Sequence, residues 1–384
     1  MQAPLRVGLN LIFLGERAGG AGRYARELPG ALLTAEPGIE LHLFVSRDAP
    51  ADLREESWAG DVRWTTVPVR LAGPPLHVPA EYALLPALAA ARRLDVLHSP
   101  ANTGPALAPR VAGVVSVLDL IWLHRPAEWE ASPRVHRTMR RRVARVAQRA
   151  DRIFAISASA GEDIASTLGV APERIEITPL GTRRADVSPT AERVLRGELD
   201  LGDARVVLCV AQKRPYKNLH RLIRALPALD PDVVLVLPGS PTAHERELRA
   251  LAEQLGVTSR VRFAGWLSDE RIEGLYGLCD AFVLPSLIEG FGMPVIDAML
   301  RGAPVACSNI PALLEIAGDA ALTFDPEQQI EVSDAIRRLL DDRALAERLA
   351  ARGRERAARF TWEQTGRASI AGYRRAIASR ARRP

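Results

Sequence analysis

Short apolar runs alternate with longer amphipathic segments along the whole chain. In the first half the apolar runs predict strands at 5–13, 41–45, 96–98, 111–118 and 153–156. In the second half they predict strands at 206–210, 233–237, 261–264, 281–284 and 305–307. Segments with helical spacing lie between them, and one long helix is predicted over 330–357. Strands that alternate with helices predict an α/β fold in which helices cover both faces of a parallel sheet.

The length of the chain predicts two domains. Its 384 residues exceed the usual size of a single core. Residues 182–204 are polar, and the apolar alternation restarts at Val206. We therefore place a domain boundary near residue 183, with one α/β domain over 1–183 and a second from 184 onward.

The composition is that of a soluble globular protein, with 47% hydrophobic and 25% charged residues. The net charge of +5 is modest and gives no argument for nucleic acid as a partner. Cys209, Cys279 and Cys307 lie in or beside apolar runs without a CxxC pair, which predicts buried free thiols in a reducing compartment. The first apolar run is interpreted as a strand rather than a signal sequence, and no run has the length of a membrane span. We therefore expect a cytoplasmic protein.

Two loops after predicted strands carry candidate ligand-binding chemistry. Residues 285–293 join strand 281–284 to a helix predicted to start at Pro294, and they contain two glycines and an acidic residue. In open α/β sheets ligands bind beyond the carboxyl ends of strands, near helix N-termini. The segment 210–219 follows another strand and holds Lys213 and Lys217, the chain's two lysines. Cations above a helix N-terminus would suit a diphosphate, although each loop could also be an ordinary turn.

Three weaker candidates lie elsewhere in the chain. A glycine-rich turn at Gly19–Gly22 follows the first strand, and Asp119 ends strand 111–118. The letters of Asp230-Pro231-Asp232 match a DxD metal motif, but the proline and the position before a strand favour a turn.

The predicted helix 134–152 carries a strongly basic face. Met139, Val143, Val146 and Ala150 form an apolar stripe, and eight arginines cover the remaining surface. One interpretation is a solvated surface helix. The other is a basic surface that meets an acidic membrane, at the inner face of the cell membrane, or a phosphorylated acceptor.

Several motifs together resemble one family. PSLIEGFGMPVIDAMLRGAPV resembles the donor-site signature of retaining GT-B glycosyltransferases of the glycosyltransferase family 4 (glycosyl transferases group 1) type. GGAGRYAREL, PYKNLHRLIRAL, GWLSDERIEGLYGLCDAFVLPS, SNIPALLEIAGDAAL and FTWEQT are similar to the same family in the same order. The resemblance implies two Rossmann-like domains facing across a cleft. The domain at 1–183 would bind the acceptor and the domain at 184–359 the nucleotide sugar, with the last helix, 360–384, crossing back to the first domain.

The resemblance also implies roles for individual residues. Glu289 would contact the donor sugar, Asp297 the nucleotide ribose and Lys217 the phosphates, and Glu289, Lys217 and Asp119 would be the catalytic residues. The main chain of Gly265-Trp266-Leu267 would touch the base. Further donor contacts are expected at Gly20, Gln212, Arg214, Gly239, Leu267, Gly290, Phe291, Gly292 and Met293. His98, Trp122 and His124 are candidates for the acceptor site.

The implied reaction moves a sugar from a nucleotide-diphosphate sugar to a hydroxyl of a glycan, a lipid-linked glycan or a small molecule, with retention at the anomeric carbon. Cations and N–H groups would stabilise the charge that develops on the diphosphate, so we expect no metal and no other cofactor. Two alternatives are a related sugar phosphorylase or synthase, and a nucleotide-sugar-binding protein with weak or lost catalysis. A glycosidase pair formed by Glu289 and Asp297 is disfavoured because a glycosidase needs no anion site.

Three positions depart from the family pattern. Asp297 stands where a glutamate is usual, which shortens its reach by about 1.5 Å. Gln212 stands where many members have a phosphate-binding arginine, for which Lys213 or Arg214 could compensate. Leu118 precedes Asp119 where a histidine is common. A leucine facing C6 would leave a 6-hydroxyl unpaired, so a 6-deoxyhexose or pentose donor is one hypothesis, and sequence drift with His98 serving instead is the other.

Overall fold

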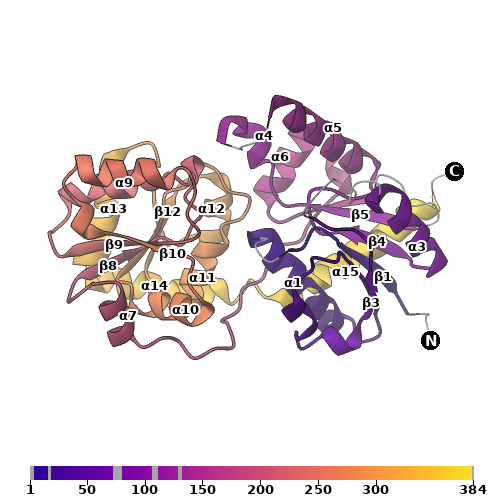
Figure 1. Cartoon of the computed structure of the whole chain (residues 1–384), viewed down its shortest axis with the longest axis horizontal. Coiled ribbons are helices and arrows are strands. Elements are labelled where there is room, and N and C mark those ends of the chain that lie inside the picture. Colours follow the sequence, from indigo (N-terminus) through magenta and orange to yellow (C-terminus); the bar gives the residue numbers. More distant parts are fainter. Residues whose placement is uncertain (1–3, 16–18, 72–79, 106–110, 129–131, 383–384) are drawn as a thin grey trace. The chain divides into compact units, whose positions relative to one another are not determined.

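The computed structural model (Figure 1) describes residues 4–15, 19–71, 80–105, 111–128 and 132–382. The chain forms two compact units. We call Met1–Gly181 with Thr361–Pro384 the N-terminal unit, and Thr182–Phe360 the C-terminal unit. The division falls between residues 181 and 182, where the sequence predicts a boundary near 183.

The N-terminal unit contains a parallel seven-stranded sheet in the order β3-β2-β1-β4-β5-β6-β7. Its strands are β1 (Arg6–Leu11), β2 (Glu40–Val45), β3 (Arg63–Thr66), β4 (Val96–Ser99), β5 (Ala112–Val117), β6 (Arg152–Ala155) and β7 (Ile175–Ile177). Its helices are α1 (Gly19–Ala35), α3 (Leu85–Ala91), α4 (Ile121–His124), α5 (Pro133–Arg149), α6 (Ala158–Leu168) and α15 (Trp362–Ala381). One turn of π-helix, η3 (Ala80–Leu84), precedes α3.

The C-terminal unit contains a parallel six-stranded sheet in the order β10-β9-β8-β11-β12-β13. Its strands are β8 (Arg205–Leu208), β9 (Val233–Pro238), β10 (Val261–Gly265), β11 (Ala281–Leu284), β12 (Val305–Ser308) and β13 (Leu322–Phe324). Its helices are α7 (Glu192–Glu198), α8 (Leu219–Ala225), α9 (Glu245–Gln254), α10 (Asp269–Leu278), α11 (Met293–Arg301), α12 (Pro311–Ala317), α13 (Gln329–Asp341) and α14 (Arg343–Ala357). The α/β prediction is confirmed for both halves.

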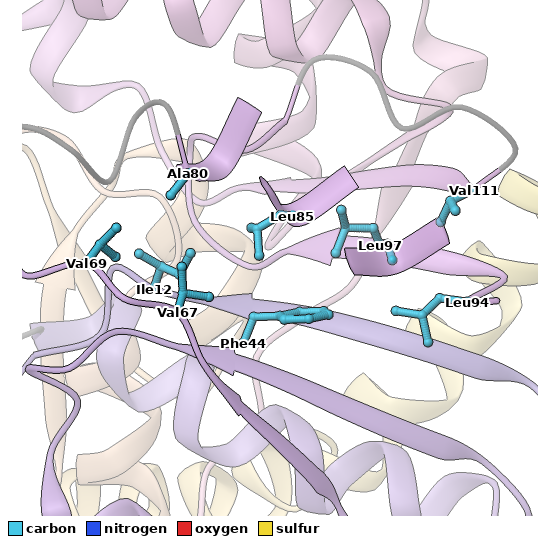
Figure 2. Close-up of a cluster of buried hydrophobic side chains, with 10 residues drawn as sticks. Ile12, Phe44, Val67, Val69, Ala80, Leu85, Leu94, Leu97 and Val111 are labelled. Atoms are coloured by element: carbon cyan, nitrogen blue, oxygen red, sulfur yellow. The ribbon is translucent and has the colours of Figure 1, made fainter. Parts of the chain in front are cut away.

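The central strands are apolar on both faces because helices cover both sides of each sheet. Every residue of β9 and of β11 is buried. In the N-terminal unit, Figure 2 shows the cluster that holds η3 and α3 on the sheet: Phe44 and Leu97 from the strands face Leu85 from α3, and Val67, Val69 and Ile12 close one end. The cysteines Cys209, Cys279 and Cys307 are free and buried, as predicted.

The last helix belongs to the N-terminal unit, as the resemblance implies. Its Trp362 stacks on Tyr24 of α1 with ring centroids 6.5 Å apart. Arg374 donates to both carboxylate oxygens of Glu36 at 2.9 Å. The Tyr373 hydroxyl lies 2.7 Å from Nδ1 of His98 in β4. These contacts fix α15 across α1 and the sheet of its own unit.

The structure corrects two expected elements. The single helix predicted over 330–357 is two helices, because Asp342 ends α13 and its carboxylate accepts the N–H of Leu345 at the start of α14. The apolar spacing continues through this break, so the sequence pattern did not reveal it. The glycines at 19–22 form the first turn of α1 rather than a loop before it. No helix among the described residues is long and apolar enough to cross a membrane.

Candidate functional site

The candidate donor site begins at the point in the C-terminal sheet where the strand order reverses. β8 pairs with both β9 and β11, so the loops that follow β8 and β11 leave neighbouring carboxyl ends. The two loops are joined by main-chain contacts: the N–H of Leu287 donates to the carbonyl of Tyr216 at 2.8 Å. Asn218, with φ of +59°, donates from its side chain to the carbonyls of Pro285 and Pro326 at 2.9 Å. The two loop segments that the sequence predicts as ligand-binding are therefore in contact with each other.

Lys217 and Glu289 meet in this place. Lys217 Nζ donates to Glu289 Oε1 at 2.6 Å, and Ser286 Oγ donates to the same oxygen at 2.7 Å. The two charged side chains are 13% and 8% exposed. Burial by itself lowers the pKa of Lys217, but Glu289 together with Tyr216 and Cys209 outweighs burial, and the pKa rises. A protonated lysine is thus held beside a carboxylate, which is a suitable pair for a phosphate and a sugar hydroxyl.

The glycine loop leads directly into α11. Gly292 has φ of +108°, and a Cβ there would lie 2.5 Å from a methyl carbon of Leu313, so only glycine fits. α11 starts at Met293 with Pro294 in its first turn. Phe291 as a whole is 3% exposed, Gly290 and Gly292 are also buried, and Met293 is partly buried. A helix N-terminus favours anions through its N–H groups and dipole.

Lys213 has a structural role, which corrects the suggestion that it compensates for Gln212. Its side chain is fully buried, and Nζ donates to the carbonyl of Gly239 at 2.5 Å and lies 3.7 Å from Glu245 Oε2. Burial lowers the pKa of Lys213, and Glu245 opposes this. Gln212 is exposed and Arg214 is partly buried, with its Nε 3.4 Å from Gln212 Oε1. Of these three residues, Gln212 and Arg214 remain candidates for the phosphates.

The ends of β9 and β10 lie beside the same loops. Gly239 has φ of +127°, and a Cβ there would lie 2.5 Å from the carbonyl oxygen of Ala211, so the β8 and β9 ends approach closely. The N–H of Gly239 donates to the carbonyl of Gly265 at 2.6 Å. Trp266 follows with 74% of its surface exposed, and Leu267 is partly buried. The segment predicted to touch the base thus adjoins the candidate donor site.

Asp297 lies in the second turn of α11 and is 8% exposed. Its Oδ1 accepts the hydroxyl of Thr182 at 2.5 Å and lies 3.6 Å from Arg301 Nη1. Glu289 and Asp297 therefore have different partners: Glu289 bonds to Lys217 and Ser286, and Asp297 to Thr182 and Arg301.

In the N-terminal unit, Asp119 and Leu118 follow β5. Asp119 Oδ1 accepts the N–H of Ile121 at 3.2 Å, and Asn102 bonds to the main chain at both positions. Gly20 is exposed in the first turn of α1, and a Cβ there would meet no atom within 4 Å. The fold of its own unit thus does not require glycine at position 20.

Two of the three acceptor candidates are buried in the core of their own unit. His98 is fully buried, with Nδ1 bonded to Tyr373 and Nε2 2.8 Å from Ser116 Oγ. Burial lowers its pKa to about 3. Trp122 is 2% exposed and packs edge-on against His136. His124 is accessible, since its side chain is 38% exposed and bonds to Asp163 at 2.8 Å.

The DxD letters belong to a turn, as interpreted from the sequence. Asp230 and Asp232 both accept hydrogen bonds from Arg205, at 2.7 to 3.0 Å. Over the described ranges we find no group of three or more His, Cys, Asp or Glu side chains that could hold a metal ion.

The structure adds residues that sequence reasoning missed. Asn218, Ser286 and Thr182 bind the loops or the carboxylates of the candidate donor site. Ser286 was detectable, because it lies three residues before Glu289. Thr182 was not, because 115 residues separate it from Asp297.

The chain is an α/β protein with two parallel sheets. Where the strand order of the C-terminal sheet reverses, a cation, a carboxylate and a helix N-terminus lie together, an arrangement suited to a phosphorylated ligand. Residues 193–356 match the family model of glycosyl transferases group 1, and residues 18–184 match that of glycosyltransferase family 4. The chain therefore belongs to the glycosyltransferase family 4, or glycosyl transferases group 1, family.

Two relatives match this chain over only part of their own length. The serotype-specific mannosyltransferase WbdA of Escherichia coli is 35% identical over 243 residues, which cover 60% of this chain and 30% of that protein. The MMP alpha-(1->4)-mannosyltransferase of Mycolicibacterium hassiacum is 29% identical over 265 residues, covering 66% of this chain and 61% of that protein. The matched part of this chain thus spans from about a third to under two thirds of these two relatives.

Solved structures share the GT-B fold over nearly the whole chain. Sucrose-phosphate synthase from Thermosynechococcus elongatus has a TM-score of 0.76 at 23% identity and covers 97% of this chain and 99% of that one. Anabaena HepE in complex with UDP-glucose has a TM-score of 0.74 at 20% identity, covering 96% and 98%. The GT-B prediction is confirmed.

Proposed function

We propose that this protein is a retaining glycosyltransferase that moves a hexose from a nucleotide-diphosphate sugar to a hydroxyl acceptor. The observation that carries the proposal is the Lys217–Glu289 pair beside the N-terminus of α11, at the reversal point of the C-terminal sheet. Membership of the family supports the same reaction.

The candidate site suggests how the donor is activated. Lys217 and the first N–H groups of α11 supply positive charge to the diphosphate, where negative charge grows as the bond to the sugar breaks. Glu289 accepts hydrogen bonds from hydroxyls of the sugar. Before the donor binds, Lys217 and Ser286 hold the Glu289 carboxylate in place. No step requires a metal ion, because the cations of the chain balance the charge.

For the sugar itself we propose a mannose-like hexose. The relatives WbdA and the MMP enzyme are named as mannosyltransferases, which supports this choice. Leu118 supports the other hypothesis, a 6-deoxyhexose or pentose, because a buried leucine cannot bind a 6-hydroxyl. UDP is one candidate nucleotide, since the HepE structure holds UDP-glucose.

For the acceptor we propose a glycan or a lipid-linked glycan. Helix α5 contains no acidic residue and exposes Arg134, Arg137, Arg140, Arg141 and Arg145, together with Val135 at 55% exposure. A basic amphipathic helix of this kind suits the surface of an anionic membrane.

One observation favours a second candidate function, a nucleotide-sugar-binding protein with weak catalysis. Asp297 is one carbon bond shorter than the glutamate usual in the family, and Gln212 carries no charge at a phosphate position. Weak binding of the ribose and phosphates would slow turnover.

Incubation with mannose, glucose, deoxyhexose and pentose donors, with sugar release followed by chromatography, tests the proposal. We expect slow hydrolysis of one donor class, its loss in Lys217→Met and Glu289→Gln, and its retention in Arg224→Met, which removes an exposed cation on α8. Release of mannose would favour a 6-hydroxylated donor, and release of a deoxyhexose would favour the Leu118 hypothesis. Binding by thermal shift without any turnover would contradict the enzyme and support the binding protein.

A further inference from the structure

The segment 182–185 is bonded to helices α10 and α11 at four consecutive residues. Its hydrogen bonds are Thr182 Oγ1 to Asp297 Oδ1 at 2.5 Å, Arg301 Nη2 to the Arg183 carbonyl at 3.4 Å, Arg184 Nη2 to the Leu300 carbonyl at 3.4 Å, and the Ala185 N–H to Glu273 Oε1 at 2.8 Å. Three of the four bonds involve α11, the helix that follows the glycine loop. The segment is thus fixed to the candidate donor site along its whole length.

A buried ion pair fixes the other side of Asp297. Arg301 and Glu273 have side chains that are 7% and 6% exposed and are bonded through both carboxylate oxygens, with Nε to Oε2 at 2.7 Å. The guanidinium also lies 5.0 Å from the ring of Tyr276. Arg301 Nη1 donates to the carbonyl of Asp297 at 2.9 Å and lies 3.6 Å from its Oδ1. The aspartate therefore lies between a buried guanidinium paired with Glu273 and a threonine hydroxyl.

The threonine itself is anchored by its main chain. Thr182 is the first residue of the C-terminal unit and Phe360 the last, and the Thr182 N–H donates to the Phe360 carbonyl at 2.9 Å. The Phe360 ring packs edge-on against Phe291 of the glycine loop, with centroids 5.9 Å apart. Both ends of the unit's chain thus meet beside the candidate donor loop, and the hydroxyl of Thr182 has a defined position.

We infer that Thr182 is a positioning residue for the donor: its hydroxyl orients the Asp297 carboxylate toward the nucleotide ribose. The inference rests on the proposed function, in which Asp297 binds the ribose. A hydroxyl-to-carboxylate bond of this length is charge-assisted and strong, so it restricts the rotation of the Asp297 carboxylate. A short aspartate that replaces a glutamate needs such a fixed orientation, because small rotations would move its oxygens out of reach.

The test uses calorimetry to find which of UDP, GDP and ADP the protein binds most tightly. The affinity for that nucleotide is then compared with the affinity for its 2′,3′-dideoxy form. We expect Thr182→Val to weaken the ribonucleotide about tenfold and to leave the dideoxy form unchanged. Thr182→Ser restores the hydroxyl and the affinity. Arg184→Ala, which loosens the same segment without touching Asp297, stays within about twofold for both nucleotides.

Equal weakening of both nucleotides by Thr182→Val would show a merely structural role and overturn the inference, as would an unchanged affinity for both. Thr182→Ala provides a second variant without the hydroxyl. Asp297→Asn tests whether Asp297 binds the ribose at all, separately from the role of Thr182. If this variant keeps the preference for the ribonucleotide, Asp297 does not bind ribose and the inference fails. The Lys217 experiment still tests the transferase activity on its own.

Discussion

Each unit has a cation–carboxylate pair where its strand order reverses, and the two pairs differ in what surrounds them. In the C-terminal unit Lys217 and Glu289 lie on the loops after β8 and β11. In the N-terminal unit Glu81 of η3 bonds to Arg142 of α5 and accepts from Asn10 of β1, which also donates to Ser99 at the end of β4. The topology is the same, but the C-terminal pair adjoins the glycine loop and the N-terminus of α11, whereas Glu81 of the N-terminal pair bonds to a side chain of β1 itself.

The difference shows that position in the sheet does not by itself define a ligand site. The Glu81 side chain is 3% exposed and that of Arg142 18%, and their partners belong to η3, α5 and the strands. This pair links two covering helical segments to the sheet. Lys217 and Glu289 instead link two loops. A ligand that binds to both charged groups and separates them therefore need not disturb the core. We therefore expect function from the C-terminal pair and stability from the N-terminal pair.

The largest effect is expected for Lys217→Met. Removing the cation leaves the leaving diphosphate without its point charge, and loss of one such electrostatic group costs about a hundredfold or more in turnover. Steady-state kinetics with the donor that the panel selects measure kcat/KM, and circular dichroism checks that the variant is folded. A variant that is folded and retains full activity would show that the C-terminal pair is structural too.

Arg142→Met is expected to act on stability instead. It leaves Glu81 buried without its cation, and breaking a buried pair from one side costs about 3 kcal/mol. Urea unfolding measures the change, and kcat/KM of the folded enzyme should stay near that of the unaltered protein. The double variant Glu81→Met with Arg142→Met should recover part of the loss, because no unpaired charge remains. A large fall in kcat/KM at unchanged stability would place the N-terminal pair in the active site.

The next effect concerns pH and His98, which is buried in β4 of the same unit as the N-terminal pair. Burial lowers its pKa to about 3, so the folded protein keeps it neutral while the unfolded chain takes up a proton below its ordinary pKa of 6.5. The contribution to stability is complete above pH 6.5 and is lost as the pH falls toward 3. Between pH 6.5 and 5 the free energy of unfolding should fall by about 2 kcal/mol from this residue.

His98→Gln supplies the comparison for this prediction. Its free energy of unfolding should depend less steeply on pH by the same amount, although it is less stable at pH 7 because Tyr373 and Ser116 lose a partner. Urea unfolding at pH 7 and pH 5 measures both. An identical pH dependence in the two proteins would mean that His98 does not remain neutral in the fold.

Most of the fold was predictable because parallel strands buried on both faces leave continuous apolar runs, as in β9 and β11. The short edge strands β3, β7 and β13 were missed, since their residues are largely exposed or partly buried. The break at Asp342 was missed because a cap depends on one side chain and leaves the apolar period intact.

The loops of the candidate site were predictable, but the partners of their side chains were not. Lys217 and Glu289 could be recognised from their motifs, and the structure joins them. The partners of Lys213 are Gly239 and Thr242 in the loop after β9 and Glu245 at the start of α9, at least 26 residues farther along the chain. His98 illustrates the same limit, because its second partner, Tyr373, lies 275 residues away on α15.

The smallest effect is expected on the surface of the N-terminal unit, where α5 continues from the Arg142 pair into exposed arginines. If α5 meets an anionic membrane, each arginine near the surface contributes about 1 kcal/mol. Arg134→Gln should therefore weaken partition onto phosphatidylserine-containing vesicles about fivefold, and Arg137→Gln should do the same. Arg348→Gln, an exposed arginine on α14 of the other unit, is the matched control and should leave partition unchanged. Electrostatic contacts are screened at 1 M salt, so vesicle binding that persists there would exclude α5 as the contact. Equal loss of binding in all three variants would exclude it too, and α5 would then be a solvated helix.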